Sequence, residues 1–256
     1  MITFSESQLV AWLSPLLWPF LRTLAIFTAA PVFSNRAVPI RVRIALAFFV
    51  ALAAQPSLQD QPLIDLNGSQ ALGAVIQQLG VGFAIGFSIR LVFAALELAG
   101  EVVGFQMGLS FASFFDPAMG GQSSAVARFF GQLGIFLFVV MNGHLLVLMT
   151  VIESFRSFPL DQNFLQASRQ IKMLDLGGQV FASGLWISLP MVGMLLFANL
   201  ALGIVSRVAP QMNIYAIGFP ITLTVGLVGM AITVPLLDQP FLSLMQRALD
   251  LFGPRP

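Results

Sequence analysis

Six long apolar stretches dominate the sequence and leave few choices for its fold. They cover roughly residues 8–33, 42–58, 71–96, 126–152, 180–206 and 212–237. A helix that crosses about 30 Å of hydrocarbon needs about 20 residues, because each residue adds about 1.5 Å along the helix axis. Five stretches reach that length, and 42–58 is marginal. The sequence therefore predicts an all-α, membrane-associated protein with about six long hydrophobic segments.

Charged residues are too few to cover a water-exposed surface. They make up 9% of the chain, whereas a typical soluble domain has about 25%, and 57% of the residues are hydrophobic. The net charge of +1 provides no basic surface for nucleic acid. The chain has no cysteine and a single histidine, His144, which argues against disulfides, thiol nucleophiles and multi-histidine metal sites. We expect a membrane protein that binds lipid but no nucleic acid, metal or cofactor.

Charges and prolines inside the apolar stretches do not fit six plain membrane spans. Arg22, Arg90 and Arg128 lie within or beside them, and a central arginine costs about 2.5–3.5 kcal/mol on insertion scales. Each arginine therefore needs a partner or a route to water. Asn142 starts an Asn-Gly turn signal inside the fourth stretch, and six prolines interrupt or bound the stretches. Broken helices of this kind are tolerated where protein or a wet cavity covers the freed backbone groups.

The loop charges follow the positive-inside rule in the first half of the chain only. The first loop carries Arg36, Arg41 and Arg43, while the second carries only acidic charges, which suits a cytoplasmic first loop. Strict alternation would then place the fourth loop outside, yet residues 156–172 are basic and residues 97–116 of the third loop are acidic. Either the span count is wrong, or the segments do not cross the bilayer in the usual way.

Candidate catalytic groups are sparse. Ser123 and Ser124, with His144 downstream, could form an intramembrane serine hydrolase. The pattern is not G-x-S-x-G, however, and nothing marks His144 as an activated base. No phosphate-binding loop is present either. We therefore predict that the protein is not an enzyme.

Three charges near the end of the third stretch could act together. Glu97 and Glu101 are four residues apart on one helical face, and Arg90 precedes Glu97 by seven residues on roughly the same face. They could form a proton relay, although such charges more often pair with a neighbouring helix. A self-contained secondary transporter with a polar cavity lined by these three residues is therefore one alternative.

The segment 104–122, GFQMGLSFASFFDPAMGGQ, shows no helical or strand period. Its glycines permit backbone conformations closed to other residues, and Asp116-Pro117 is a turn dipeptide. Its phenylalanines and methionines could fill a passage and move aside, because apolar packing excludes water without fixed geometry. An ordinary interhelical loop at the bilayer interface explains the composition equally well.

Four motifs resemble the FliR/SctT family of type III secretion export-gate subunits, which contains the flagellar FliR proteins and their injectisome counterparts. They are RTLAIFTAAPVFSNRAVPIRVRIALA (22–47), GEVVGFQMGLSFASFFDP (100–117), NGHLLVLMTVIESF (142–155) and SRVAPQMNIYAIGFPITLTVGL (206–227). They run in order over nearly the whole chain, and the last is the most specific. The stretch LLWPFLRTLAIF is more similar to the flagellar branch than to the injectisome branch.

The resemblance implies a structural subunit of the flagellar type III export gate, in the basal body at the bacterial inner membrane. Such a subunit joins FliP and FliQ in a channel for unfolded flagellar proteins, with FlhB and FlhA as further partners and much of the assembly on the periplasmic side. An injectisome export gate is the alternative within the family. The implied fold is a set of helical hairpins, like a P subunit joined to a Q subunit. We expect a single export-gate domain over 1–256, with hydrophobic helices in 1–96, a pore loop in 97–125 and further helices in 126–256.

The resemblance also implies roles for individual residues. Met107, Phe111, Phe114 and Phe115 would seal the closed pore, glycines would allow it to open, and Asp116-Pro117 would shape the turn. The full set of plug or gate residues is Met107, Gly108, Phe111, Phe114, Phe115, Asp116, Pro117, Gly120 and Gly121. The subunit contacts or internal charges are Arg22, Arg90, Glu97, Glu101 and Arg207. Pro210 is expected to end a helix next to Arg207.

Overall fold

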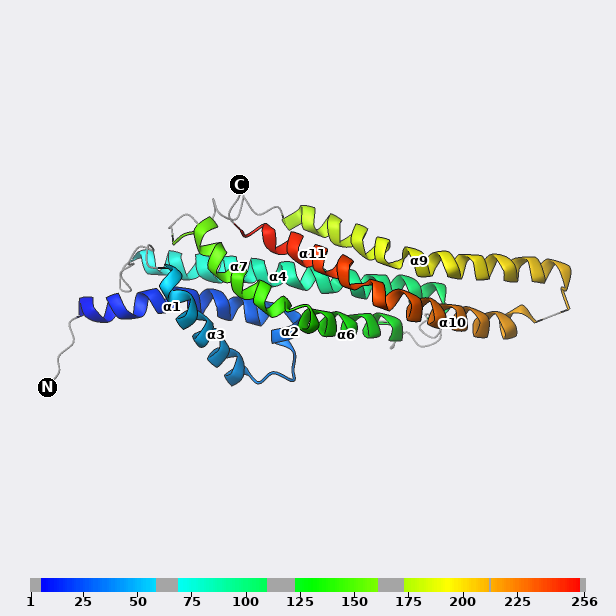
Figure 1. Cartoon of the computed structure of the whole chain (residues 1–256), viewed down its shortest axis with the longest axis horizontal. Coiled ribbons are helices and arrows are strands. Elements are labelled where there is room, and N and C mark those ends of the chain that lie inside the picture. The colour runs from blue at the N-terminus through cyan, green and yellow to red at the C-terminus, as the bar shows by residue number, and fades with distance from the viewer. Residues whose placement is uncertain (1–5, 59–68, 110–122, 161–172, 212, 254–256) are drawn as a thin grey trace. The chain divides into compact units, whose positions relative to one another are not determined.

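The computed structural model describes residues 6–58, 69–109, 123–160, 173–211 and 213–253, and every regular element in these ranges is a helix (Figure 1). The predicted all-α fold is confirmed. The N-terminal helices are α1 (Glu6–Ala29), α2 (Pro31–Ser34), α3 (Ile40–Ala54), the 3-10 turn η1 (Gln55–Leu58) and α4 (Ser69–Gln106). The remaining elements are α6 (Ala125–Val140), α7 (Gly143–Ser157), α9 (Met173–Val208), α10 (Ile214–Thr233), η3 (Val234–Leu236) and α11 (Asp238–Asp250).

Each predicted apolar stretch coincides with one helix or a broken pair. The fourth apolar stretch, 126–152, is interrupted at the predicted Asn-Gly turn, because Asn142 adopts the left-handed conformation (φ 56°) between α6 and α7. α9 ends at Val208, two residues before Pro210. α4 continues to Gln106, so the first three residues of the predicted irregular segment 104–122 are helical. Hydropathy did not reveal α11, because this helix buries Phe241 and its neighbours on one face and carries polar residues on the other.

Fewer helices can span a membrane than the sequence suggests. Among the described residues, 71–106, 176–208 and 216–236 are long and apolar enough, and the broken pair α6–α7 would add a fourth. The sequence contains five stretches of sufficient length. The smaller number agrees with the failure of the positive-inside rule in the second half of the chain.

The chain divides into two compact units, each assembled from separate pieces. The first unit contains Met1–Leu91, Asn142–Leu176 and Met245–Pro256. The second contains Val92–Met141 and Gly177–Leu244. α4 contributes its first part to one unit and its second part to the other.

In the first unit, two glycines of α4 allow α1 to approach closely. A Cβ atom at Gly82 would lie 2.7 Å from the Cβ of Ala25, and one at Gly86 would lie 2.6 Å from the Cβ of Ala29. Glycines four residues apart remove side chains from one helix face, so two helix backbones can pack at short range. Arg22 of α1 lies at this close approach and donates a hydrogen bond to Gln78 of α4.

In the second unit, α6 packs on α4 through the same arrangement. A Cβ atom at Gly100 would lie 2.6 Å from the Cα of Ala127, and one at Gly104 would lie 2.9 Å from the Oγ of Ser124. Aromatic contacts continue this core, because the ring of Phe93 lies 6.0 Å from that of Phe138 and 5.8 Å from that of Phe241. The close approach of α4 and α6 thus places Gly104 beside Ser124, although 19 residues separate them in the sequence.

Candidate functional site

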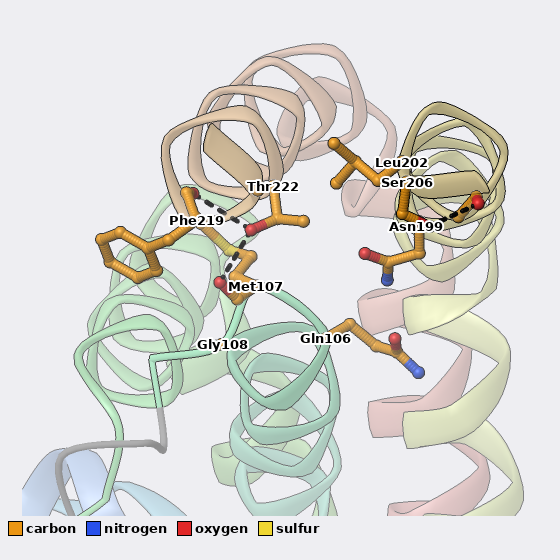
Figure 2. A pocket seen from close by; sticks show the side chains of 10 residues that line it. Gln106, Met107, Gly108, Asn199, Leu202, Ser206, Phe219 and Thr222 are labelled. Carbon is orange, nitrogen blue, oxygen red and sulfur yellow. Dashed lines mark hydrogen bonds between the residues drawn. The ribbon is translucent and has the colours of Figure 1, made fainter. Parts of the chain in front are cut away.

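A pocket of about 680 Å³ lies in the second unit at the end of α4, just before the 110–122 segment (Figure 2). Its walls come from residues 106–108, from residues 199–206 of α9 and from residues 218–222 of α10. None of the described residues that line it is titratable. The pocket therefore offers apolar contacts and neutral hydrogen-bonding groups, and none of Arg90, Glu97 and Glu101 lines it.

The backbone at the end of α4 forms a Schellman motif, in which a residue of left-handed conformation closes a helix. The amide of Gly108 donates to the carbonyl of Phe105 (3.0 Å), and the amide of Leu109 donates to the carbonyl of Gly104 (3.1 Å). Gly108 has a φ of +81°, which the motif requires of its closing residue. Gly108 thus provides a defined end of α4 directly before the 110–122 segment.

Met107 is held by α10 through both its side chain and its backbone. The side chain is fully buried, and a Cβ atom at Gly226 would lie 2.5 Å from its Sδ atom. The hydroxyl of Thr222 lies 3.2 Å from the carbonyl oxygen of Met107 and 3.1 Å from that of Phe219 (Figure 2). This contact attaches the last residues of α4 to α10.

Two side-chain amides, those of Gln106 and Asn199, lie on different walls of the pocket (Figure 2). Neither forms a hydrogen bond with another residue that the structure describes. An amide offers two donors and an acceptor. Both groups are therefore available to water or to a bound molecule.

The other end of the 110–122 segment leads into a capped α6. The Oγ of Ser124 accepts a hydrogen bond from the amide of Ala127 (3.1 Å), and the Oε1 of Glu101 accepts one from the amide of Ser124 (3.0 Å). In a capping box the side chain of the N-cap residue accepts from the amide of the third helical residue, and the side chain of that third residue, a Glu or Gln, accepts from the N-cap amide. Ala127 occupies that position here, and Glu101 of α4 supplies the missing carboxylate. A negative charge is also favourable at a helix N-terminus.

Arg22 forms a second buried polar site, in the first unit. It is fully buried on α1, and its Nε donates to the Oε1 of Gln78 (2.8 Å). Its Nη1 donates to the Oγ of Ser154 (2.9 Å), and its Nη2 donates to the carbonyl of Phe158 (2.9 Å). The guanidinium carbon lies 3.5 Å from the ring centroid of Phe155. Because Phe158 follows the last turn of α7, the arginine also meets the negative end of that helix dipole.

The remaining predicted charges are at the surface of their units. Arg90 is exposed on α4 and borders a smaller pocket of about 380 Å³ with Phe83 and Phe87. Glu97 is exposed and lies against Gly131, whose Cβ would be 3.1 Å from its Oε1. Arg207 is exposed in the last turn of α9. The described part of the chain contains no ion pair, so Arg90, Glu97 and Arg207 have no charged partner there.

The serines and the histidine have ordinary structural surroundings. Ser124 caps α6, as described above, and Ser123 precedes it with an exposed side chain. His144 is half-buried in the first turn of α7. Seven of the predicted plug residues lie outside the described residues: Phe111, Phe114, Phe115, Asp116, Pro117, Gly120 and Gly121.

Several residues that position these sites were not recognised from the sequence. Gln78, Thr222 and Gly226 carry no local signal, because their partners are distant along the chain. The glycine pairs of α4 could have been found, since G-x-x-x-G within an apolar stretch indicates close helix packing.

The comparison with protein families decides the relationship. The sequence model of the bacterial export proteins, family 1, matches residues 13–248. The chain belongs to this family. The match covers residues of both units and all four motifs that resemble the FliR/SctT proteins, so that resemblance is confirmed.

Individual relatives in the family are similar over most of their length. The chain is 40% identical over 255 residues to the flagellar biosynthetic protein FliR of Pectobacterium carotovorum subsp. carotovorum, covering 99% of this chain and 97% of that protein. It is 40% identical over 239 residues to FliR of Escherichia coli K12, covering 93% of this chain and 90% of that protein. It is 31% identical over 212 residues to FliR of Bacillus subtilis 168, covering 82% of each.

Proposed function

We propose that this chain is a structural subunit of the flagellar type III protein export gate in the bacterial inner membrane. The observation that carries the proposal is the family match over residues 13–248, together with relatives of 40% identity that are named flagellar biosynthetic proteins. The long apolar helices fit a membrane location. The chain contributes to the wall of a protein-conducting channel and catalyses no reaction itself.

The partners in this proposal are FliP and FliQ, with FlhB and FlhA as further contacts, and the transported molecules are unfolded flagellar proteins. Large apolar side chains on α9 support an assembled state: Trp186 is 72% exposed and Phe197 is 76% exposed. Exposed apolar surface of this extent needs cover from lipid or from other subunits. Among the described residues only three or four helices are able to span a membrane, which leaves part of the chain for the proposed position on the periplasmic side of the membrane plane.

Within this assembly the 110–122 segment acts as the pore loop of a single export-gate domain. Phe111, Phe114 and Phe115 seal the closed channel, Gly120 and Gly121 provide freedom to open, and Asp116-Pro117 shapes the turn. Gly108 and Met107 contribute by ending α4 and attaching it to α10, and Ser124 caps the helix that follows. Support for this assignment comes from the fixed helix ends on either side, because a movable seal needs rigid anchors.

The native mass of the chain in mild detergent tests the proposal. The chain is expressed alone, with FliP and FliQ from the same organism, and with each partner separately. We expect heterogeneous material from the chain alone and one large, defined complex when both partners are present. A homogeneous monomer that gains nothing from either partner would contradict the assignment.

A further inference from the structure

α3 is attached to the first unit along one narrow face. Ala47, Ala51 and Ala54 are fully buried, and the helix packs on α1. Small side chains at this spacing lie on one side of a helix. The other faces of α3 have no cover among the described residues.

The uncovered faces are apolar around most of the helix. Ile40 is 67% exposed and Phe49 is 63% exposed, and Ile44, Phe48 and Leu52 are also exposed. A docking site for a single partner helix would be a stripe of about 100°. The wider distribution on α3 is typical of a helix that contacts lipid chains on several sides.

Arginines gather at the N-terminal end of this helix. Arg36 and Arg41 are exposed, and Arg43 is half-buried with its Nε atom buried and without an acceptor. None of them forms an ion pair within the described residues, and no acidic residue occurs between Glu6 and Asp60. In addition, Pro39 offers no side-chain acceptor to the first amides of α3. Several donors therefore lack an anionic partner at one end of an apolar helix.

We propose that α3 enters the lipid bilayer from one leaflet, with Arg36, Arg41 and Arg43 bound to the phosphates of anionic phospholipids. Guanidinium groups match phosphate oxygens in geometry and charge. The helix has 15 residues and a length of about 22 Å, which reaches into the acyl layer but does not cross about 30 Å of hydrocarbon. A basic end at the headgroups and an apolar body among the chains agree with that depth. The inference does not depend on the export-gate assignment.

Lipid binding to the intact chain tests the charged part of the proposal. Native mass spectrometry in mild detergent compares retention of phosphatidylglycerol with that of phosphatidylcholine of the same chain length. The variant R36Q/R41Q/R43Q is compared with R128Q/R156Q/R247Q, which removes three exposed arginines elsewhere and has the same net charge. One basic residue near an anionic surface changes binding about fivefold, or ~1 kcal/mol, so we expect a loss on the order of 100-fold in the first variant only.

A depth measurement tests the apolar part. Because the chain has no cysteine, single fluorophores can be attached to A37C and F49C without further changes. In vesicles of phosphatidylcholine and phosphatidylglycerol, we expect headgroup spin labels to quench position 37 and acyl-chain spin labels to quench position 49. The same experiment is repeated on the complex with FliP and FliQ.

Four outcomes would overturn the proposal. Equal retention of both lipids, or equal loss in the two triple variants, would show that these arginines do not form a lipid site. Competition by soluble glycerol phosphate at similar concentration would indicate a phosphate site independent of the bilayer. If acyl-chain spin labels do not quench the fluorophore at position 49 in the complex, the exposed face of α3 is a subunit interface.

Discussion

Replacing Arg22 by methionine tests whether the buried guanidinium holds the first unit together. Methionine has a similar length and apolar stem but no donor. The change therefore leaves three acceptors without their partner: the Oε1 of Gln78, the Oγ of Ser154 and the carbonyl of Phe158. All three lie in the interior next to Phe155, where water does not replace the lost donors.

The expected magnitude follows from the contacts. A hydrogen bond to a charged group contributes about 1.5–3 kcal/mol, and three of them are lost. Removing a buried charge offsets several kcal/mol of this, because the guanidinium no longer has to leave water on folding. We therefore expect a net destabilisation of roughly 2–4 kcal/mol. For a chain of this size each kcal/mol lowers the melting temperature by about 2–4 °C.

Thermal unfolding in mild detergent measures the effect, with R247M as the control because Arg247 is exposed in the same unit. We expect the control to change stability by less than about 0.5 kcal/mol. Adding Q78L to R22M removes one orphaned acceptor, so the double variant should be more stable than the two single effects predict. A melting temperature for R22M equal to that of R247M would refute the reasoning.

Four further predictions follow from the second unit and from the proposed assembly. G100A should destabilise the chain by about 1–2 kcal/mol in thermal unfolding, because the added Cβ would lie 2.6 Å from the α6 backbone. The control G193A has open space around the added Cβ and should be neutral or stabilising. Equal effects of the two variants would contradict close packing of α4 and α6. S124A and E101A should each cost about 1 kcal/mol through the α6 cap, and strict additivity of the double variant would argue against a shared cap. Deleting residues 110–120 should leave the complex intact but raise ion flux through the membrane, so an unchanged ion barrier would rule out the pore-loop assignment. R207A should lower recovery of the complex with FliP and FliQ relative to R156A, which removes an exposed arginine from the end of α7, and equal recovery would remove Arg207 from the contact surface.

Local sequence signals predicted the breaks between helices well. Asn142 sits at a break because Asn-Gly is a turn signal that acts through its own backbone conformation. Pro210 follows the end of α9 for a similarly local reason, since a proline cannot continue a helix. The end of α4 was placed too early, because the helix is closed by backbone bonds from Gly108 to Phe105 and from Leu109 to Gly104, which hydropathy does not register.

Burial of the charged residues could not be predicted from the sequence. Arg22 and Arg90 both lie in apolar stretches, yet one is fully buried and the other is exposed. The difference depends on Gln78, Ser154 and the end of α7, which are 56 to 136 residues away from Arg22. Similarly, Glu101 was expected to pair with a cation and instead caps α6.

The amino-acid sequence by itself determined the helical, membrane-associated class and the family, because apolar length and motif order are properties of the linear chain. Tertiary structure alone decided which arginine is buried, which glycines allow helices to touch and which carboxylate caps α6. The physical reason is that hydrogen bonds and close packing depend on the surroundings of a residue. For Arg22, Glu101 and Gly226 those surroundings come from helices far away in the sequence.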